Sequence, residues 1–456
     1  MDRKLLVAAI SGALLAGAAL PVSAKVSQAE ADKLKGELTP VGGVRAANKD
    51  GSIPAWDGGL TKPASCFKGE GERYCDPLPD DKPKFEINAG KHEQYKEQLS
   101  AGQITMFKTY GETYKIPVYE TRRTFANPQF IYDATYKNAT SAELGGNGEA
   151  LNGAVTGIPF PIPKNGHEVI WNHKVRFRDI SATRWNNQFA VTTSGNYNQV
   201  KIREDVLFSY SKKGIKPADL NNVILYFLQI TTEPPKLAGT ILLVHETMDQ
   251  VKEARRAWQY NPGQRRLRRA PDVGYDNPGT GADGLRFNDQ TDTFNGAMNR
   301  YAWKLVGKRE MYVPSSNSYK LHSDEYKYSD IVKRGHIDQD LTRYELRRVW
   351  IVDATNEDGM DEHQYGRRVF YVDEDSWQIV LVDIYDKRGQ LWRFQEAHTV
   401  IAYDKPYQLP IAETVYDFQN GRYLVQALNN EEPETAAAEF DDSYFAPNAV
   451  KKHARR

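Results

Sequence analysis

The chain has 456 residues, of which 26% are charged, and its 60 basic and 60 acidic side chains balance each other. A balanced charge supplies no basic face, so the composition argues against a nucleic-acid partner. The mean hydropathy is −0.65, and no apolar segment of spanning length follows residue 24, which excludes an integral helical membrane protein. Aromatic residues make up 11% of the chain, and such side chains suit the pleated surface of a β-sheet.

Residues 1–24 have the pattern of a cleavable export signal. Two basic residues near the start precede an apolar run from Leu5 to Leu20, and small residues ending at Ala24 provide a cleavage site. The run is too short and too interrupted for a spanning helix. The sequence therefore predicts a periplasmic protein whose mature form begins at Lys25, with no stable membrane insertion.

The chain has two cysteines, Cys66 and Cys75, which flank a short loop containing glycine. In an exported protein such a pair favours a disulfide bond. The alternatives are a metal-binding pair or free thiols, but no histidine lies nearby to complete a zinc site. We therefore predict a Cys66–Cys75 disulfide, no metal site and no cofactor.

The exported chain is predicted to divide into an N-terminal arm, residues 25–85, and a single domain, residues 86–456. The arm is rich in Gly, Pro, Asp and Lys, with isolated apolar residues at Ile53, Trp56 and Leu60. Isolated apolar side chains in a polar segment need a surface to pack on. We therefore expect these three to anchor the arm on the domain.

Two helices and one long loop are predicted in the first third of the chain. The helices are Gln28 to Glu37 and Lys91 to Tyr110, the second from apolar residues at an i, i+3/i+4 spacing. Gly102 weakens the second prediction, because glycine is a poor helix former. The polar, Gly-rich stretch Asn138 to Asn152 is predicted to be a loop.

From residue 168 the pattern changes to strands, with alternating or short apolar segments separated by turns. The predicted strands are Glu168–Phe177, Gln188–Thr193, Val200–Tyr210, Val223–Thr231, Thr240–Glu246, Ala254–Tyr260, Lys304–Val313, Tyr344–Val352, Arg367–Val372, Ile379–Tyr385 and Leu391–Tyr403. Residues 261–264 (Asn-Pro-Gly-Gln) and 386–389 (Asp-Lys-Arg-Gly) are turn sequences. Short connections predict an antiparallel sheet, and a sheet of about a dozen strands must curl, split or close. The predicted fold is mainly β with some α, a curved half-barrel with helices on its concave side.

Five motifs in the chain resemble one known family. They are GELTPVGGVRAANKDGSIPAWDGGL from Gly36, TYKIPVYETRR from Thr113, GIPFPIPKNGHEVIWNH from Gly157, YNPGQRRLRRAP from Tyr260, and FAPNAVKKHAR near the C-terminus. In this order they are similar to the exported proteobacterial family called domain of unknown function 1329. The resemblance covers essentially the whole mature chain.

The resemblance implies a fold similar to the periplasmic lipoprotein-localisation factors, a curved antiparallel half-barrel around helices with an apolar cavity. It also implies a genetic association with envelope proteins, including export pumps of the resistance-nodulation-division class. It transfers no catalytic residue, and the loop from Cys66 to Cys75 is not part of the family pattern.

The chain does not match the known motifs for catalysis or metal binding, because the required residues or spacings are absent. His-Glu pairs begin at His92, His167 and His245, but the zinc-protease pattern needs a second histidine four residues after the first, and none is there. The acidic segment 353–363 lacks the glycine position and the final Glu of a calcium loop. The mature chain has no nucleophile elbow, phosphate loop or dinucleotide glycine pattern. We therefore predict no catalytic residues and no enzyme activity.

A group of arginines, Arg265, Arg266, Arg268 and Arg269, has two interpretations. Arginine binds phosphate and carboxylate groups bidentately, so the group suits a lipid headgroup at a cavity rim. On a strand, however, Arg265 and Arg269 face one side while Arg266 and Arg268 face the other. The alternative is a solvated strand end.

The GIPFPIP segment is predicted to cover the sheet, because proline cannot donate to a sheet ladder. Phe160 and Ile162 then either close the core as a fixed lid or form a mobile gate over an apolar cavity. Trp171 follows directly, on the predicted strand that the lid covers. The candidate ligand-binding residues are therefore Phe160, Ile162, Trp171, Arg265 and Arg268.

These observations predict a periplasmic carrier that binds a hydrophobic ligand, a lipid or lipid-like molecule, in a concave sheet without catalysis. One alternative is an accessory subunit of a resistance-nodulation-division export system without a ligand of its own. The other is an envelope hydrolase whose site is assembled from dispersed Asp, Glu and His residues. An apolar cavity would favour the carrier, a filled core the subunit, and a polar cleft with perturbed carboxylates the hydrolase.

Overall fold

The computed structural model describes residues 25–270, 275–360, 362–435 and 438–453, so the predicted export signal lies outside the described residues. Within these ranges, no helix is long and apolar enough to cross a membrane. The helices are α1 (Gln28–Ala31), α2 (Ala101–Thr109), α3 (Gln129–Ser141), α4 (Gly166–Val175), α5 (Tyr328–Ile331) and α6 (Val450–His453).

Fifteen strands of the described chain form one sheet. They are β1 (Phe85–Ile87), β2 (Ile116–Val118), β5 (Ser181–Val191), β6 (Tyr197–Leu207), β7 (Val223–Glu233), β8 (Ile241–Thr247), β9 (Arg256–Asn261), β10 (Arg266–Arg269), β11 (Ala302–Pro314), β12 (Tyr344–Thr355), β13 (Arg367–Asp373), β14 (Ile379–Tyr385), β15 (Leu391–Ala402), β16 (Tyr407–Asp417) and β17 (Arg422–Leu428). A separate hairpin pairs β3 (Glu143–Gly145) with β4 (Ala150–Asn152).

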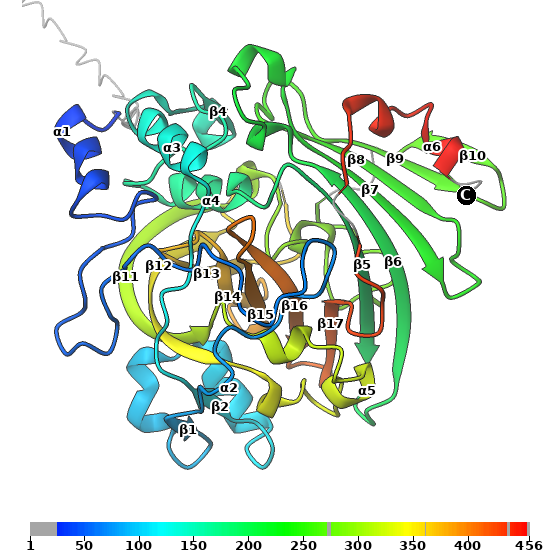
Figure 1. Ribbon diagram of the computed structural model, residues 1–456. Helices are drawn as coiled ribbons and strands as arrows, with labels where there is room; N and C mark the ends of the chain where they lie inside the picture. The colour runs from blue at the N-terminus through cyan, green and yellow to red at the C-terminus, as the bar shows by residue number, and fades with distance from the viewer. Residues whose placement is uncertain (1–24, 271–274, 361, 436–437, 454–456) are drawn as a thin grey trace, which may run out of the picture.

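The sheet runs in the order β1-β2-β12-β13-β14-β15-β16-β17-β5-β6-β7-β8-β9-β10, with β11 paired to β12. All pairs are antiparallel except one parallel bridge between β2 and β12. Figure 1 shows a strongly curved sheet that does not close into a barrel, with β7 to β10 extending to the upper right. The predicted fold class, a mainly β protein with a large curved sheet and some helices, is confirmed.

Every strand predicted after Phe177 overlaps a strand of the sheet, and the turns at 261–264 and 386–389 join β9 to β10 and β14 to β15. Glycine suits a positive φ at the third position of such a turn, but Gly263 does not have one, and Arg265, which follows the first turn, has a φ of 52°. β16 and β17 were not predicted. β16 contains Pro410, which the strand tolerates because it lies at a bulge where the register with β15 shifts.

The prediction of a strand at Glu168–Phe177 is wrong, because this segment forms helix α4. Asn165 caps the helix, its side-chain oxygen accepting a hydrogen bond from the Glu168 N–H at 3.0 Å. Every residue of α4 except His167 is buried. A short helix buried on all sides has no solvent-exposed face, so its sequence lacks the helical period that would distinguish it from a buried strand.

The other helix predictions need smaller corrections. The predicted helix Gln28–Glu37 is confirmed as α1 followed by a 3₁₀ helix, Asp32–Lys35. The predicted helix Lys91–Tyr110 divides at Leu99 into a 3₁₀ helix, His92–Gln98, and α2. The predicted loop 138–152 is wrong in part, since it contains the end of α3 and the β3–β4 hairpin.

Helices cover both faces of the sheet. Val352, Phe370, Val382 and Gln395 are successive partners across β12 to β15, so they share one face, while Asp383 and its partner Phe394 lie on the other. A Cβ added to Gly166 at the start of α4 would lie 3.0 Å from Val352, whereas one added to Gly102 of α2 would lie 2.1 Å from the Phe394 ring. α4 and α2 therefore pack on opposite faces, and Gly102 allows α2 its close approach.

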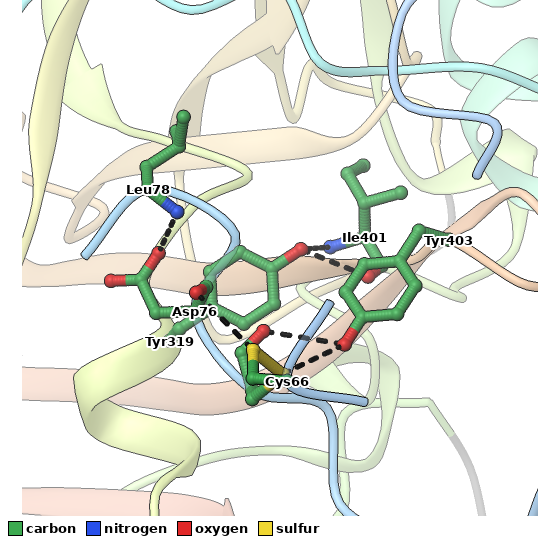
Figure 2. The surroundings of a disulfide bond; sticks show 7 residues. Cys66, Asp76, Leu78, Tyr319, Ile401 and Tyr403 are labelled. Carbon is green, nitrogen blue, oxygen red and sulfur yellow. Dashed lines mark hydrogen bonds between the residues drawn. A yellow bond between two sulfur atoms is a disulfide. The ribbon is translucent and has the colours of Figure 1, made fainter. Parts of the chain in front are cut away.

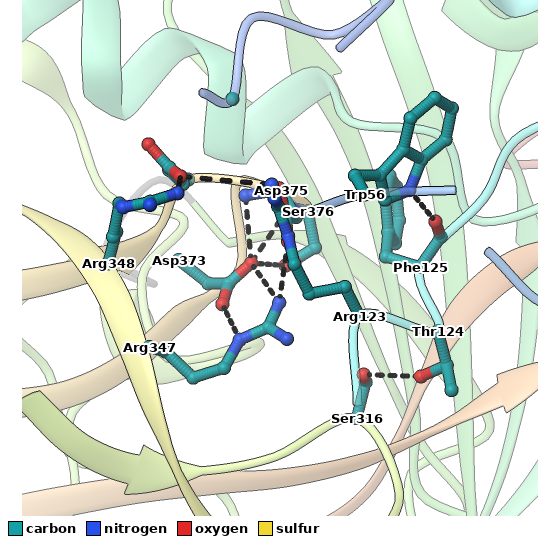
Figure 3. A network of polar contacts seen from close by, with 12 residues as sticks. Trp56, Arg123, Thr124, Phe125, Ser316, Arg347, Arg348, Asp373, Asp375 and Ser376 are labelled. Atoms are coloured by element: carbon teal, nitrogen blue, oxygen red, sulfur yellow. Dashed lines mark hydrogen bonds and ion pairs between the residues drawn. The ribbon is translucent and has the colours of Figure 1, made fainter. Parts of the chain in front are cut away.

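The arm is held on the domain by buried side chains and by Arg123. Ile53 is buried, Trp56 donates from Nε1 to the Phe125 carbonyl at 3.0 Å, and the Leu60 N–H donates to the Thr124 carbonyl at 2.8 Å. Figure 3 shows Arg123 at the centre of an ion-pair network with Asp375, near Arg347 and Asp373. Trp56 and Leu60 therefore contact residues 124–125 beyond the arm, and Ile53 is buried.

The predicted Cys66–Cys75 disulfide is present, and the loop that it closes lies against the domain. Tyr403 lies beside it, with its hydroxyl 3.4 Å from both the Cys75 carbonyl oxygen and the Cys75 sulfur (Figure 2). Arg73, in the loop, donates to the carbonyls of His322, Asn429 and Glu432 at 2.8 to 3.1 Å. The disulfide thus fixes a loop that is also held by hydrogen bonds to distant segments.

Candidate functional site: an apolar cavity with unpaired cations

A cavity lies on the face of the sheet that carries α4, between β5 to β8, β16 and the segment 280–295. Register places its strand residues on that face, because the row that starts at Gln395 continues through Val415 and Leu424 to Ala190 of β5. Ala182 lies on the same side of β5 as Ala190, and its partner Val206 is followed across the sheet by Phe227 and Val244. About 140 Å³ is open to the centres of water molecules, roughly ten times the 10–15 Å³ that one water needs on this measure. The cavity has room for a ligand larger than a single water.

The strand side of the cavity is apolar. Leu225, Phe227 and Leu242 line it and remain partly exposed, although side chains on a covered sheet face are normally buried. The opposite face of the same strands is filled, since Leu228 and Leu243 are fully buried in a cluster with Phe445 from the C-terminal segment. The partly exposed apolar side chains therefore belong to the cavity and not to a loosely packed strand region.

Charged residues surround the apolar strand residues, and most are paired. Asp292 is bound by Arg176 at 2.5 Å and by Arg178, and these two guanidinium groups keep the pKa of Asp292 below its usual range despite its burial. Arg184 is 2.5 Å from Glu204, and Arg255 is paired with Glu246. These pairs satisfy the buried charges of four of the surrounding arginines.

Two buried cations of the cavity have no carboxylate within 4.0 Å among the described residues: Lys174 of α4 and Arg286. Both are 6% exposed. The Lys174 ammonium donates to the Gly296 carbonyl at 2.6 Å and lies 5.0 Å from the Trp171 ring. Burial lowers the pKa of Lys174 to about 8, so it remains mostly protonated at neutral pH. Within the described chain the Arg286 guanidinium donates one hydrogen bond, from Nη1 to the Phe287 carbonyl at 3.4 Å, and its Nε has no partner.

An open groove of about 500 Å³ adjoins the cavity and shares Leu242, Thr280 and Asn288 with it. The cross-strand row from Gln229 through Leu242 and Gln259 to Arg268 connects the two on one face of the sheet. Arg266, Arg268 and Arg269 line the groove, and Arg265 does not. The register places Arg266 and Arg268 together on the cavity face, as the predicted alternation requires. Arg265 lies outside β10, so the register does not place it with Arg269, and Arg269 lines the groove as well.

The structure places the other predicted ligand-binding residues elsewhere. Phe160 and Ile162 line a small hollow of about 10 Å³ beside α3 and α4, and the Asn172 side chain holds both backbone groups of Phe160 at 2.7 and 2.9 Å. Trp171 is fully buried, donates from Nε1 to the Gly148 carbonyl at 2.8 Å, and does not line the main cavity. Of the predicted residues, only Arg268 lies next to the cavity.

Three residues of the site, Lys174, Phe227 and Arg286, were not predicted from the sequence. Phe227 was on a predicted strand, and its alternation gave two possible faces without saying which one borders a cavity. Lys174 was on a segment predicted as a strand, and Arg286 lies between strands in a segment without periodicity. No local pattern marks a cation as buried and unpaired, because this depends on contacts between distant segments.

A second hollow, of about 130 Å³, lies beneath the disulfide loop. It is lined by Glu70, Glu72 and Tyr74 of that loop and shares Arg184, Tyr407 and Leu409 with the main cavity. Within the described residues, no group of three or more His, Cys, Asp or Glu side chains could hold a metal ion. Of the two hollows, the main cavity is the better candidate for a binding site, because apolar and cationic groups converge there.

Comparison with known proteins places the chain in a family. Residues 86–451 match the model of a family described as protein of unknown function (DUF1329). An uncharacterized protein of Pseudomonas aeruginosa, PA3922, is 48% identical over 440 residues, which cover 96% of each chain.

Three solved structures are similar to part of the chain, each over 62% of its length. They are a DUF1329 family protein from Desulfovibrio piger (TM-score 0.43, 14% identity, 97% of that chain), a putative outer membrane lipoprotein-sorting protein domain from Vibrio parahaemolyticus (0.41, 14%, 97%), and the LolA superfamily protein NE2245 from Nitrosomonas europaea (0.37, 13%, 98%). The family match and the 48% identical relative agree with the motifs found in the sequence. The chain belongs to the DUF1329 family.

Proposed function

We propose that the protein is a carrier that binds a hydrophobic ligand, a lipid or lipid-like molecule, in the cavity on the α4 face of the sheet. The observation that carries this proposal is the set of apolar strand residues, Leu225, Phe227 and Leu242, that stay partly exposed inside the cavity. Covering such surface with an apolar ligand stabilises the complex by about 25 cal/mol per Å² removed from water. The groove that opens beside Leu242 gives the ligand a route in and out.

The proposal is tested with the neutral apolar dye N-phenyl-1-naphthylamine and the variant Phe227→Gln. The wild-type protein is expected to bind the dye with a fluorescence increase at one-to-one stoichiometry. The glutamine amide has no partner in an apolar wall, and leaving such a group unpaired costs about 1–3 kcal/mol. Phe227→Gln should therefore weaken binding about 5- to 150-fold.

The matched control is Val306→Gln, because Val306 lies on β11 and is 54% exposed to solvent. It should bind the dye like the wild type. Circular dichroism should show that both variants are folded. The carrier proposal is abandoned if the folded wild-type protein does not bind the dye, or if both variants bind it equally well.

We further propose that the protein acts in the periplasm after removal of residues 1–24. The disulfide supports an oxidising compartment, and Lys25 forms an ion pair with Glu143 at 2.7 Å, which would hold a mature N-terminus on the domain. N-terminal sequencing of the protein from a periplasmic extract is expected to begin at Lys25. A retained Met1 would contradict the proposal.

A further inference from the structure

The charges that line the cavity do not balance. Five cationic side chains line it, Lys174, Arg178, Arg184, Arg255 and Arg286, against two carboxylates, Glu246 and Asp292. Adding the residues paired or packed just behind them brings in two arginines, Arg176 and Arg368, and three carboxylates, Glu204, Asp289 and Glu413. Seven cations then face five carboxylates, so the positive excess persists.

This excess is concentrated in the two buried cations without a carboxylate partner. Glu413 and Glu204 exert the largest favourable influences on Arg286, but neither lies within 4.0 Å of it in the described structure. A buried charge without a partner is costly, and proteins normally pair it. Arg286 is also packed tightly, since a Cβ on Gly279 would lie 2.3 Å from its Nη1. The guanidinium is therefore held in the cavity wall at the expense of stability, as expected for a group that binds a ligand.

We infer that the ligand is an anionic amphiphile, whose hydrocarbon chain lies against Phe227 and Leu242 and whose carboxylate or phosphate head group binds Lys174 and Arg286. This inference rests on the proposed carrier function and adds the charge of the ligand to it. The anionic head group would supply the missing partner of both cations with charge-assisted hydrogen bonds.

The arginines of the groove fit the same ligand. Arg266 and Arg268 lie on the cavity face and are exposed, and neither has an ion-pair partner among the described residues. Unpaired cations at the mouth of a cavity attract anions and raise the rate at which they associate. Arg268 stands at the end of the cross-strand row that leads to Leu242.

The test compares ligands that share one chain and differ in the head group. Dodecanoate, dodecyl phosphate and dodecanol are used to displace N-phenyl-1-naphthylamine from the wild-type protein. The two anions are expected to bind at least about tenfold more tightly than dodecanol, which corresponds to about 1.4 kcal/mol. Acetate and inorganic phosphate, which carry the charge without the chain, should not displace the dye.

Variants then assign the effect to the two cations. Arg286→Gln and Lys174→Met should each weaken dodecanoate binding at least about tenfold and change dodecanol binding less than about twofold. Removing an unpaired buried charge should not lower stability, so urea unfolding should find Arg286→Gln at least as stable as the wild type. A stability loss in Arg286→Gln with unchanged ligand preference would overturn the inference.

The groove is tested by association kinetics. Arg268→Gln should slow dodecanoate association several-fold and reduce its dependence on salt, whereas Arg309→Gln, an exposed arginine on β11, should leave both unchanged. Equal effects of the two variants would remove the groove from the inference. If dodecanol binds as tightly as dodecanoate, the carrier proposal stands and the anionic ligand is wrong. If neither compound nor the dye binds, the carrier proposal itself fails.

Discussion

Replacing Arg123 with methionine is expected to lower the free energy of unfolding by about 3–5 kcal/mol, the cost of removing one partner from a buried ion pair. Arg123 is 5% exposed. Its Nε and Nη2 donate to the two carboxylate oxygens of Asp375 at 2.9 and 2.6 Å. The remaining N–H groups donate to the carbonyls of Val44, Arg45 and Pro54 at 2.8 to 3.2 Å.

All five N–H groups of this guanidinium are therefore used, and three of them hold the arm. Methionine fills similar space but leaves Asp375 with one arginine fewer. The Pro54 carbonyl loses the one donor it has in the described structure. The Val44 and Arg45 carbonyls each lose one of two donors and keep Arg348 and the Trp56 N–H. Urea unfolding should show the loss in stability, and limited proteolysis should show faster cleavage between residues 44 and 60.

The neighbouring arginine provides the control. Arg122 pairs with Asp81 at 2.9 Å, but its side chain is 38% exposed. Exposed ion pairs contribute about 0–1 kcal/mol, so Arg122→Met should change stability by less than about 1 kcal/mol and leave the arm protected. Similar small effects of both variants would show that Arg123 does not secure the arm.

The architecture could be predicted from the sequence because strand alternation and turn residues are local signals. The segment Ile379–Tyr385 is both a predicted and an observed strand with the same ends, and the turn after it has Gly389 at a positive φ of 77°. Helix α4 could not be predicted, because buried residues lie on all sides of the helix and the sequence therefore lacks a helical period. β16 was missed for a related reason, since Pro410 interrupts a pattern that a bulge then accommodates.

The candidate site could be predicted from the sequence only in part. The alternation of Arg266 and Arg268 placed them on one side of a strand, and the structure shows that this side borders the cavity. Trp171 was expected there because of the strand assignment, whereas the helix places it in the core and turns Lys174 to the cavity instead. Pairing decides which cations are free to bind a ligand, and the partners come from distant parts of the chain, as Arg176 and Asp292 do.

Replacing Glu396 with glutamine is expected to stabilise the protein at neutral pH by about 3 kcal/mol and to leave it nearly unchanged at pH 4. Glu396 lies on β15 and is fully buried. It accepts one hydrogen bond, from the Tyr344 hydroxyl at 2.8 Å, and its second oxygen has no partner in the described structure. Burial raises the pKa of Glu396 to about 8.

The direction of the pH effect on stability follows from which state, folded or unfolded, binds the proton of the Glu396 carboxyl. Between pH 4.5 and pH 8 the folded state keeps this carboxyl protonated, while the unfolded state releases the proton. Because the folded state binds the extra proton, stability falls as pH rises through this window, by up to about 1.4 kcal/mol per pH unit. Glutamine stays neutral throughout, so the variant escapes this loss.

The measurement is urea unfolding of the wild type and the variant at pH 4.5, 6 and 7.5, because the difference between them cancels other titrating groups such as the buried His398. The gain of Glu396→Gln should increase with pH, and Glu97→Gln, which changes an exposed glutamate, should show a difference near zero at every pH. A gain that does not depend on pH would show that Glu396 is ionised in the folded protein. In that case a cation or water must reach its second oxygen, because an ionised carboxylate in an apolar core requires a partner.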